Sequence, residues 1–194
     1  MFEVRIHGRG GQGVVTAAEL LSIAAFAEGK YAQAFPTFGS ERMGAPVVSF
    51  CRWSEHPIRV REPIATPDAV ILQDPTLLQS ANPFHGLKPS GWLLINSDLT
   101  TEELGISNLF STECTPRLSI IPASSVAVRY LGKPLPNACL LGAFAALTGL
   151  LNIDSVVRAI REKFSGHLAS RNESAAHACY DIALERSLAY VETA

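Results

Sequence analysis

A run of glycines near the start of the sequence has the composition of an anion-binding turn. Residues 8–13 read Gly-Arg-Gly-Gly-Gln-Gly, which satisfies the G-x-G-x-x-G pattern with one extra glycine. An alternating apolar and polar segment, residues 2–7, precedes this loop, and a helix-favouring segment, residues 14–28, follows it. Glycines at such a strand-to-helix turn permit a tight backbone and leave amide N–H groups free to bind a phosphate. The pattern therefore predicts an anion-binding loop, with a purely structural turn as the alternative.

A standard NAD site is disfavoured by the residues that follow the second predicted strand, residues 31–35. A dinucleotide-binding fold places an acidic residue about 20 positions after the glycines, where it holds the ribose hydroxyls. This sequence has Phe35, Pro36 and Thr37 at that place. We expect a phosphorylated ligand at the loop, but not a nicotinamide dinucleotide.

A second polar segment, residues 38–46, follows the same strand and reads Phe-Gly-Ser-Glu-Arg-Met-Gly-Ala-Pro. Its Ser40 and Arg42 carry hydrogen-bond donors that suit phosphate oxygens. In an α/β sheet this segment would lie beside the glycine loop, at the carboxyl ends of the strands. The residues alone leave a structural turn, with Glu41 and Arg42 solvated or paired, as the other interpretation.

The remaining reactive side chains form no further pattern that indicates a site. No two of the four cysteines have the Cys-x-x-Cys spacing of zinc sites and ferredoxin-type clusters. His7 ends the first predicted strand beside the loop, where we expect it to be hydrogen-bonded to neighbouring backbone rather than to act as a general base. We therefore predict neither a catalytic residue nor a metal ligand in this chain.

Strands and helices alternate along the first two thirds of the chain, and the last third is helical. Further strands are predicted at residues 47–53, 58–61, 69–73, 92–96 and 118–121. Further helices are predicted at residues 124–131, 137–150, 154–164 and 172–191. The continuous apolar runs at 69–73 and 92–96 are typical of strands covered on both faces. We predict one domain, residues 1–194, with a three-layer α/β/α, Rossmann-like fold and a mostly parallel but mixed sheet.

The composition is that of a globular protein whose surface carries few charges. Hydrophobic residues make up 47% of the chain and charged residues 18%, with a net charge of −2. This balance gives no electrostatic footprint for nucleic acid or an anionic membrane, and no apolar run is long enough to span a bilayer. The cysteine spacing and the absence of a secretion-type start predict a cytoplasmic protein, and the low charge suggests a surface covered by a partner.

The two glycine-containing segments, taken together, carry a family resemblance. Residues 10–13 followed by residues 39–47 resemble the gamma subunit of pyruvate:ferredoxin oxidoreductase and related 2-oxoacid:acceptor oxidoreductases. The resemblance extends essentially over the whole chain, including residues 137–143 and the final helix predicted to open at Asn172. In single-chain members of this family the same unit is an internal domain.

The resemblance implies a role within a heteromeric complex. Enzymes of this family decarboxylate pyruvate, another 2-oxoacid or phenylglyoxylate and release an acyl-coenzyme A, using thiamine diphosphate, Mg²⁺ and 4Fe–4S clusters. Alpha-, beta- and delta-type subunits are implied as partners that hold those cofactors, and the electron acceptor is ferredoxin, or NAD through a flavin subunit. The resemblance further implies that this chain holds no redox centre and helps to form the coenzyme A site and the assembly interface.

Site residues follow from the same resemblance. The candidates for contacts with the coenzyme A phosphates are Gly10, Gly11, Gln12, Gly13, Ser40, Arg42 and Gly44. Arg42 is the expected charged contact and Gln12 a polar one. Ser40 and Met43 stand where the family pattern has Pro and Arg, which removes one cation beside Arg42. A stand-alone nucleotide-binding oxidoreductase and a purely structural assembly subunit are the alternatives.

Replacement of Arg42 tests the charged contact. Arg42→Ala is expected to weaken the use of coenzyme A without loss of assembly, because the change removes a phosphate-binding cation and leaves the backbone intact. The measurement is the KM for coenzyme A in the assembled complex, and an unchanged KM would contradict the assigned role.

Overall fold

The computed structural model describes residues 1–37, 43–79, 82–107 and 116–192. These segments contain six strands, five α-helices and one short 3-10 helix, joined by loops and turns. Their order is β1 (Phe2–Arg9), α1 (Val14–Ala27), β2 (Tyr31–Pro36), β3 (Pro46–Ser54), β4 (Ala69–Leu72), η1 (Pro75–Gln79), β5 (Trp92–Asn96), β6 (Arg117–Ile121), α2 (Ala123–Leu131), α3 (Asn137–Thr148), α4 (Ile153–Lys163) and α5 (Gly166–Glu192).

All six strands form one mixed sheet in the order β2-β3-β1-β4-β5-β6. The strands β1, β4, β5 and β6 run parallel to one another, whereas β3 lies between β1 and β2 and is antiparallel to both. The predicted α/β class with a mostly parallel, mixed sheet is therefore confirmed. Because β2 and β1 point the same way, the end of β2 and the start of β3 lie at the same edge of the sheet as the glycine loop.

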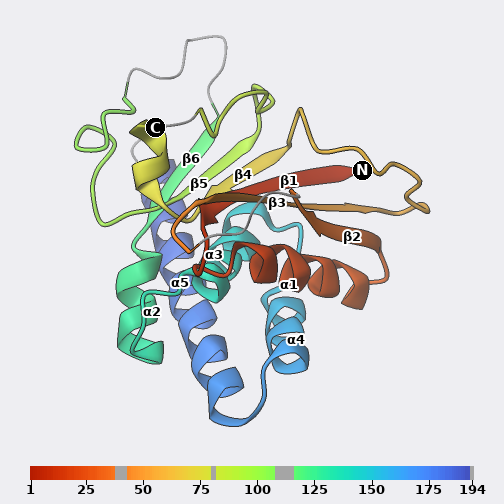
Figure 1. Ribbon diagram of the computed structural model, residues 1–194. Coiled ribbons are helices and arrows are strands. Elements are labelled where there is room, and N and C mark those ends of the chain that lie inside the picture. Colours follow the sequence, from red (N-terminus) through yellow and green to blue (C-terminus); the bar gives the residue numbers. More distant parts are fainter. Residues whose placement is uncertain (38–42, 80–81, 108–115, 193–194) are drawn as a thin grey trace.

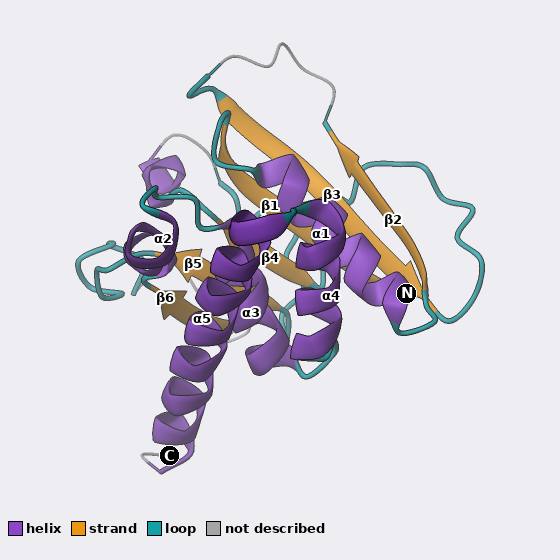
Figure 2. Cartoon of the chain, turned by 90° about the horizontal axis from the view of Figure 1, so that it is seen from below, coloured by secondary structure: helices purple, strands orange, loops and turns teal. Residues whose placement is uncertain are grey.

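One face of the sheet is covered by helices: Figures 1 and 2 show α1, α3 and α5 on this side, and α4 packs on these three helices. Alternate strand residues such as Val4, Ile6 and Ile71 point into this layer and join its buried core. The helices contribute alanines and leucines to that core, and α3 packs closely against α5. Hydrophobic burial between sheet and helices is thus the main source of stability on this side.

The opposite face has a smaller core, covered by η1 and the turns around it. Val70 and Leu72 of β4 face this side, where they pack with Leu77, Leu93 and other apolar residues. The buried Arg5 of β1 donates hydrogen bonds to the carbonyl oxygens of three residues in these turns, namely Ile64, Pro83 and His85. Irregular segments can cover this face because a buried side chain satisfies their carbonyl groups.

Two predicted elements differ from the structure. Residues 58–61 alternate apolar and polar side chains but form no strand, because Val60 is exposed like its charged neighbours and the segment pairs with no strand in the described part. The final helix begins at Gly166, six residues before the predicted cap at Asn172. The Asn172 side chain instead donates to the Leu168 carbonyl inside the helix, at 2.8 Å. Among the described residues, none of the helices combines the length and the apolar character required to cross a membrane.

Close packing of α3 on α5 depends on the absence of a side chain at Gly142. A Cβ atom there would lie 2.0 Å from the Ala176 carbonyl oxygen of α5. Gly142→Ala is expected to lower the free energy of unfolding by about 1–3 kcal/mol, because overpacking outweighs the better helix propensity of alanine. Urea unfolding of the full chain measures this change.

Ala146→Gly, at a half-buried position of the same helix, is the matched control. It loses helix propensity, worth roughly 0.5–1 kcal/mol, without a steric clash. A Gly142→Ala protein as stable as the unsubstituted chain would show that the two helices do not need this close approach.

Candidate functional site

The glycine loop between β1 and α1 adopts a backbone that requires glycine at two positions. Gly11 and Gly13 have φ angles of 94° and 74°, in the left-handed region that other residues rarely enter. Gly13 also lies against Asn137 of α3, since a Cβ atom there would be 2.5 Å from the Asn137 amide nitrogen. The loop is therefore a well-defined turn that leads directly into α1 and lies against Asn137 at the start of α3.

The second glycine-containing segment is held against this loop by backbone hydrogen bonds. The Gly10 amide donates to the Ala45 carbonyl at 2.9 Å, and the Gly44 amide donates to the Gly10 carbonyl at 3.1 Å. The expected neighbourhood of the two segments is thus confirmed for residues 43–46. Ser40 and Arg42 lie outside the described residues, so their predicted contacts stay predictions.

A cleft of about 420 Å³ opens beside the paired segments. Its lining residues are Arg9, Gly10, Gly11, Gly13, Val14, Val15, Thr16, Met43 and Val47. Three predicted site residues, Gly10, Gly11 and Gly13, therefore form its wall. Gln12 and Gly44 are close by but do not line it.

The amino-terminal end of α1 forms part of that wall and carries no cap. Gly13 occupies the cap position, no described side chain bonds to the first amides, and the first turn contains no acidic residue. Helix geometry leaves the first N–H groups without intrahelical acceptors, and the helix dipole adds partial positive charge there. This end of the helix therefore has the donors and the charge to bind an anion.

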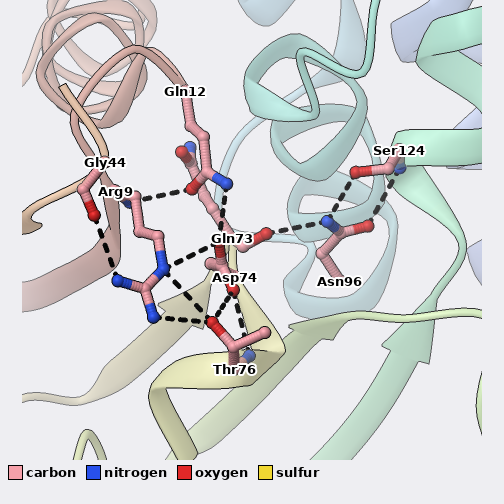
Figure 3. A network of polar contacts seen from close by, with 8 residues as sticks. All are labelled: Arg9, Gln12, Gly44, Gln73, Asp74, Thr76, Asn96 and Ser124. Carbon is pink, nitrogen blue, oxygen red and sulfur yellow. Dashed lines mark hydrogen bonds and ion pairs between the residues drawn. The ribbon is translucent and has the colours of Figure 1, made fainter. Parts of the chain in front are cut away.

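Gln12 turns away from the cleft and bonds within the protein. Its Oε1 accepts from the Arg9 amide at 2.8 Å, and its Nε2 donates to Asp74 at 2.7 Å. Both ends of the Gln12 amide are thus used to hold the loop, as Figure 3 shows.

Asp74 follows β4 directly and is the centre of the polar network drawn in Figure 3. Its carboxylate accepts from the backbone amide and the hydroxyl of Thr76, at 3.0 and 2.6 Å, and pairs with the Arg9 guanidinium at 3.3 Å. Burial favours the neutral acid, but the hydrogen bonds from Thr76 and Gln12, with the charge of Arg9, outweigh it and lower the pKa of Asp74. The carboxylate therefore stays ionised at neutral pH.

The sequence analysis missed Arg9, Asp74 and Thr76. A signal was available for Asp74, because it directly follows the apolar run of a buried strand, and polar residues at the carboxyl ends of such strands face the usual ligand site. Nothing in the sequence joins Asp74 to Gln12, which lies far from it in the chain.

A second part of the network ties the ends of β4, β5 and α2 together. The Asn96 amide donates to the Gln73 carbonyl at 2.7 Å and to the Ser124 hydroxyl at 2.8 Å, while its oxygen accepts from the Ser124 amide at 2.9 Å. The carboxyl ends of β4 and β5 are thus cross-linked to each other and to the start of α2 (Figure 3).

Comparison with known proteins identifies the family. Residues 3–182 match the family described as pyruvate ferredoxin/flavodoxin oxidoreductase. The chain belongs to this family.

Its relatives are gamma-type subunits of nearly the same length. The chain is 46% identical to the pyruvate/ketoisovalerate oxidoreductases common subunit gamma of Pyrococcus furiosus, over 93% of this chain and 96% of that protein. It is 44% identical to the pyruvate synthase subunit PorC of Methanothermobacter marburgensis, over 93% and 97% of the two chains. This member of the family is therefore a gamma-type subunit, as the sequence resemblance indicated.

Solved structures agree at the level of the fold. The pyruvate oxidoreductase subunit PORC of Thermotoga maritima superimposes with a TM-score of 0.79 at 31% identity and covers 93% of this chain and 95% of its own. A 2-oxoglutarate:ferredoxin oxidoreductase from Magnetococcus marinus, solved with 2-oxoglutarate, coenzyme A and succinyl-CoA bound, has a TM-score of 0.72 at 18% identity. This chain corresponds to 31% of that longer one, so the fold also occurs as one unit of a larger polypeptide.

His7 lies on the sheet face opposite α1, away from the amino-terminal end of that helix. Its Nε2 accepts a hydrogen bond from the Arg5 guanidinium at 2.9 Å, so its partner is a side chain rather than the expected backbone. Burial lowers the pKa of His7 to about 4, and the charge of Arg5 adds to the shift. His7 of this gamma-type subunit is thus neutral at pH 7, with its proton on Nδ1.

The described cysteines are buried and free, and they offer no reactive thiol. Burial raises the pKa of Cys51, and contact with Cys179 together with burial raises that of Cys139. No three His, Cys, Asp or Glu side chains of the described segments converge in a way that could hold a metal ion.

The lowered pKa of His7 predicts a pH dependence of stability. The unfolded chain binds a proton at this site below about pH 6.5, whereas the folded chain binds it only near pH 4. Stability should therefore be full above pH 6.5 and fall as the pH drops through this window, by up to roughly 3 kcal/mol.

His7→Gln keeps an acceptor for Arg5 and removes the titration. The free energy of unfolding, measured with urea at neutral pH and near pH 4.5, should fall less in this variant than in the unsubstituted chain. Equal losses in the two proteins would show that His7 does not titrate as described.

Proposed function

We propose that this chain is the gamma-type subunit of a thiamine-diphosphate-dependent 2-oxoacid:acceptor oxidoreductase, and that it supplies the phosphate-binding wall of the coenzyme A site. One observation carries the proposal: the uncapped, acid-free amino-terminal end of α1 forms a wall of the cleft. Amide donors and a helix dipole at one place suit the pyrophosphate or the 3′-phosphate of coenzyme A.

The other wall of the cleft suits the less polar parts of the same ligand. Val15, Val47 and the exposed Met43 face the space beside the amide donors. Apolar walls with a few placed polar groups are typical of cofactor sites, and about 420 Å³ is within the usual range for part of such a ligand. Coenzyme A, with charged phosphates joined to an uncharged and less polar arm, matches this division.

In the proposed reaction a 2-oxoacid loses carbon dioxide, two electrons pass to the acceptor, and the acyl group is transferred to the thiol of coenzyme A. Thiamine diphosphate supplies the decarboxylation chemistry and the iron–sulfur clusters carry the electrons. We propose that alpha-, beta- and delta-type subunits hold these groups together with Mg²⁺. This chain then binds and orients coenzyme A and performs no proton or electron transfer itself.

The individual contacts are part of the same proposal. Gly10, Gly11 and Gly13 would offer their backbone to the phosphates, and Gly44 would hold its segment against them. Ser40 and Arg42 would add a hydroxyl and a cation from that segment. Ferredoxin or a flavin subunit would be the acceptor, and the complex would be cytoplasmic.

A purely structural subunit is the second candidate, and Met43 is the observation that favours it. Its side chain is 88% exposed and lies beside Gly11 at the cleft, where a partner subunit could cover it. A stand-alone dehydrogenase is less favoured, because Phe35 and Pro36 replace the ribose-binding acid at the end of β2.

Replacement of Thr16 tests coenzyme A binding at the cleft. Thr16 lines the cleft in the first turn of α1, where an acidic side chain favours the helix but repels a phosphate. In the complete complex, purified anaerobically through a tag on this chain, Thr16→Asp should raise the KM for coenzyme A about tenfold or more. The kcat and the KM for the 2-oxoacid should stay nearly unchanged.

Thr16→Asn is the matched control, because it has the same shape as the aspartate without its charge. It should leave the KM for coenzyme A within about a factor of two, since no repulsion is added. Equal KM values for all three complexes would refute coenzyme A binding at this cleft and favour the structural subunit.

A further inference from the structure

The carboxylate of Asp74 is surrounded by hydrogen-bond donors from separate parts of the chain. One oxygen accepts from the amide and the hydroxyl of Thr76, and the other accepts from Gln12 and pairs with Arg9. The residue is 9% exposed, so these contacts replace most of its solvation. Asp74 therefore joins the turn after β4 to the glycine loop.

Arg9 extends the same connection to the second glycine-containing segment. Its guanidinium donates to the Gly44 carbonyl at 3.0 Å and to the Thr76 hydroxyl at 2.8 Å, while it pairs with Asp74. Figure 3 shows this side chain between Gly44 and Thr76. Its planar fork of donors suits such a bridge among three acceptors.

Neither Gln12 nor Asp74 lines the cleft, so neither is placed to contact the ligand. Both ends of the Gln12 amide are engaged inside the protein, and a carboxylate in contact with a phosphate would repel it. Their position fits a different role, which is to set the shape of the loop that presents the amides.

We propose that Asp74 is a positioning residue for coenzyme A, acting through Gln12 and Arg9 to hold the glycine loop and residues 43–46 together at the amino-terminal end of α1. The proposal rests on the proposed function and deepens it, because it assigns Gln12 to the support of the loop instead of to the ligand. Binding sites tolerate displacements of only about half an ångström in their donors, so a loosened loop would bind the phosphates poorly.

A carboxylate fits this position better than an amide. All four neighbouring groups donate to Asp74, so an amide must point its NH2 group either at the Thr76 backbone amide or at Gln12 and Arg9. Asp74→Asn therefore disrupts the contacts while the size of the side chain is kept.

The experiment uses Asp74→Asn in the complete complex, with coenzyme A as the probe. We expect the KM for coenzyme A to rise about tenfold, with kcat and the KM for the 2-oxoacid within about a factor of two. We also expect faster hydrogen exchange in peptides that cover residues 9–15 and 43–47, with no change in α3. A general loss of stability would not produce this local pattern.

Asp68→Asn is the matched control at the other end of the same strand. Asp68 is also part-buried and paired, with Lys88 at 2.6 Å and the Glu3 amide at 2.9 Å, but it lies far from the cleft. It should leave the KM for coenzyme A and the exchange of the loop unchanged.

A reversed pair supplies a second test, which holds even if the single variant assembles poorly. Gln12→Glu alone sets a second carboxylate against Asp74 and should also raise the KM for coenzyme A. The double variant Gln12→Glu/Asp74→Asn restores a donor facing an acceptor and should recover part of the loss. Recovery supports positioning through this contact, and losses that simply add overturn it.

The outcomes separate this proposal from the proposed function. If Thr16→Asp weakens coenzyme A use while Asp74→Asn changes neither the KM nor the exchange, the positioning role is overturned and the function stands. If Asp74→Asn loosens the loop but neither variant affects coenzyme A, the role towards coenzyme A is overturned together with the proposed function.

Discussion

The antiparallel pairing of β1 with β3 is the constraint on which the arrangement of the site depends. The two strands are in register from Phe2 opposite Trp53 to Arg9 opposite Pro46. Because β3 starts opposite the end of β1, the residues just before Pro46 lie against the glycine loop. Two backbone hydrogen bonds, from Gly10 to Ala45 and from Gly44 to Gly10, continue the strand pairing there. A one-residue slip of β3 against β1 would turn the side chains of β3 to the opposite faces and separate the two segments. The register of the sheet therefore also determines the geometry of the site.

The site also shows a conflict between local stability and ligand binding. A helix start with glycine at the cap position forgoes roughly a few tenths of a kcal/mol relative to a side-chain cap, and left-handed glycines cost further chain entropy. The surrounding structure compensates, since Asp74, Arg9 and the Asn96–Ser124 contacts cross-link the strand ends beneath the loop. The strand ends are thus cross-linked, while the helix that starts among them keeps its first amides without a side-chain cap. This arrangement is expected where a bound anion, instead of a side chain, accepts the hydrogen bonds of those amides.

Much of the fold could be predicted from local patterns, and the failures have a common cause. The apolar runs of β4 and β5 and the loop before α1 each follow from residues adjacent in sequence. The alternation at residues 58–61 was wrong because no strand is available to pair with that segment in the described structure. Gln12 was predicted to contact coenzyme A, whereas its side chain bonds to Asp74 inside the protein. This partner could not be predicted, because the contact depends on β1 and β4 being neighbours.

The balance of charge at the cleft fits the proposal that the coenzyme A site is completed by other subunits. Of the described residues that line the cleft, Arg9 alone is charged, and Asp74 already balances it. The attraction for phosphates then comes mainly from the helix dipole, about half a unit charge. Coenzyme A carries several negative charges, so under the proposed function Arg42 or cations of neighbouring subunits would supply the rest. A chain that offers amides and shape but little net positive charge is suited to a composite site, completed on assembly.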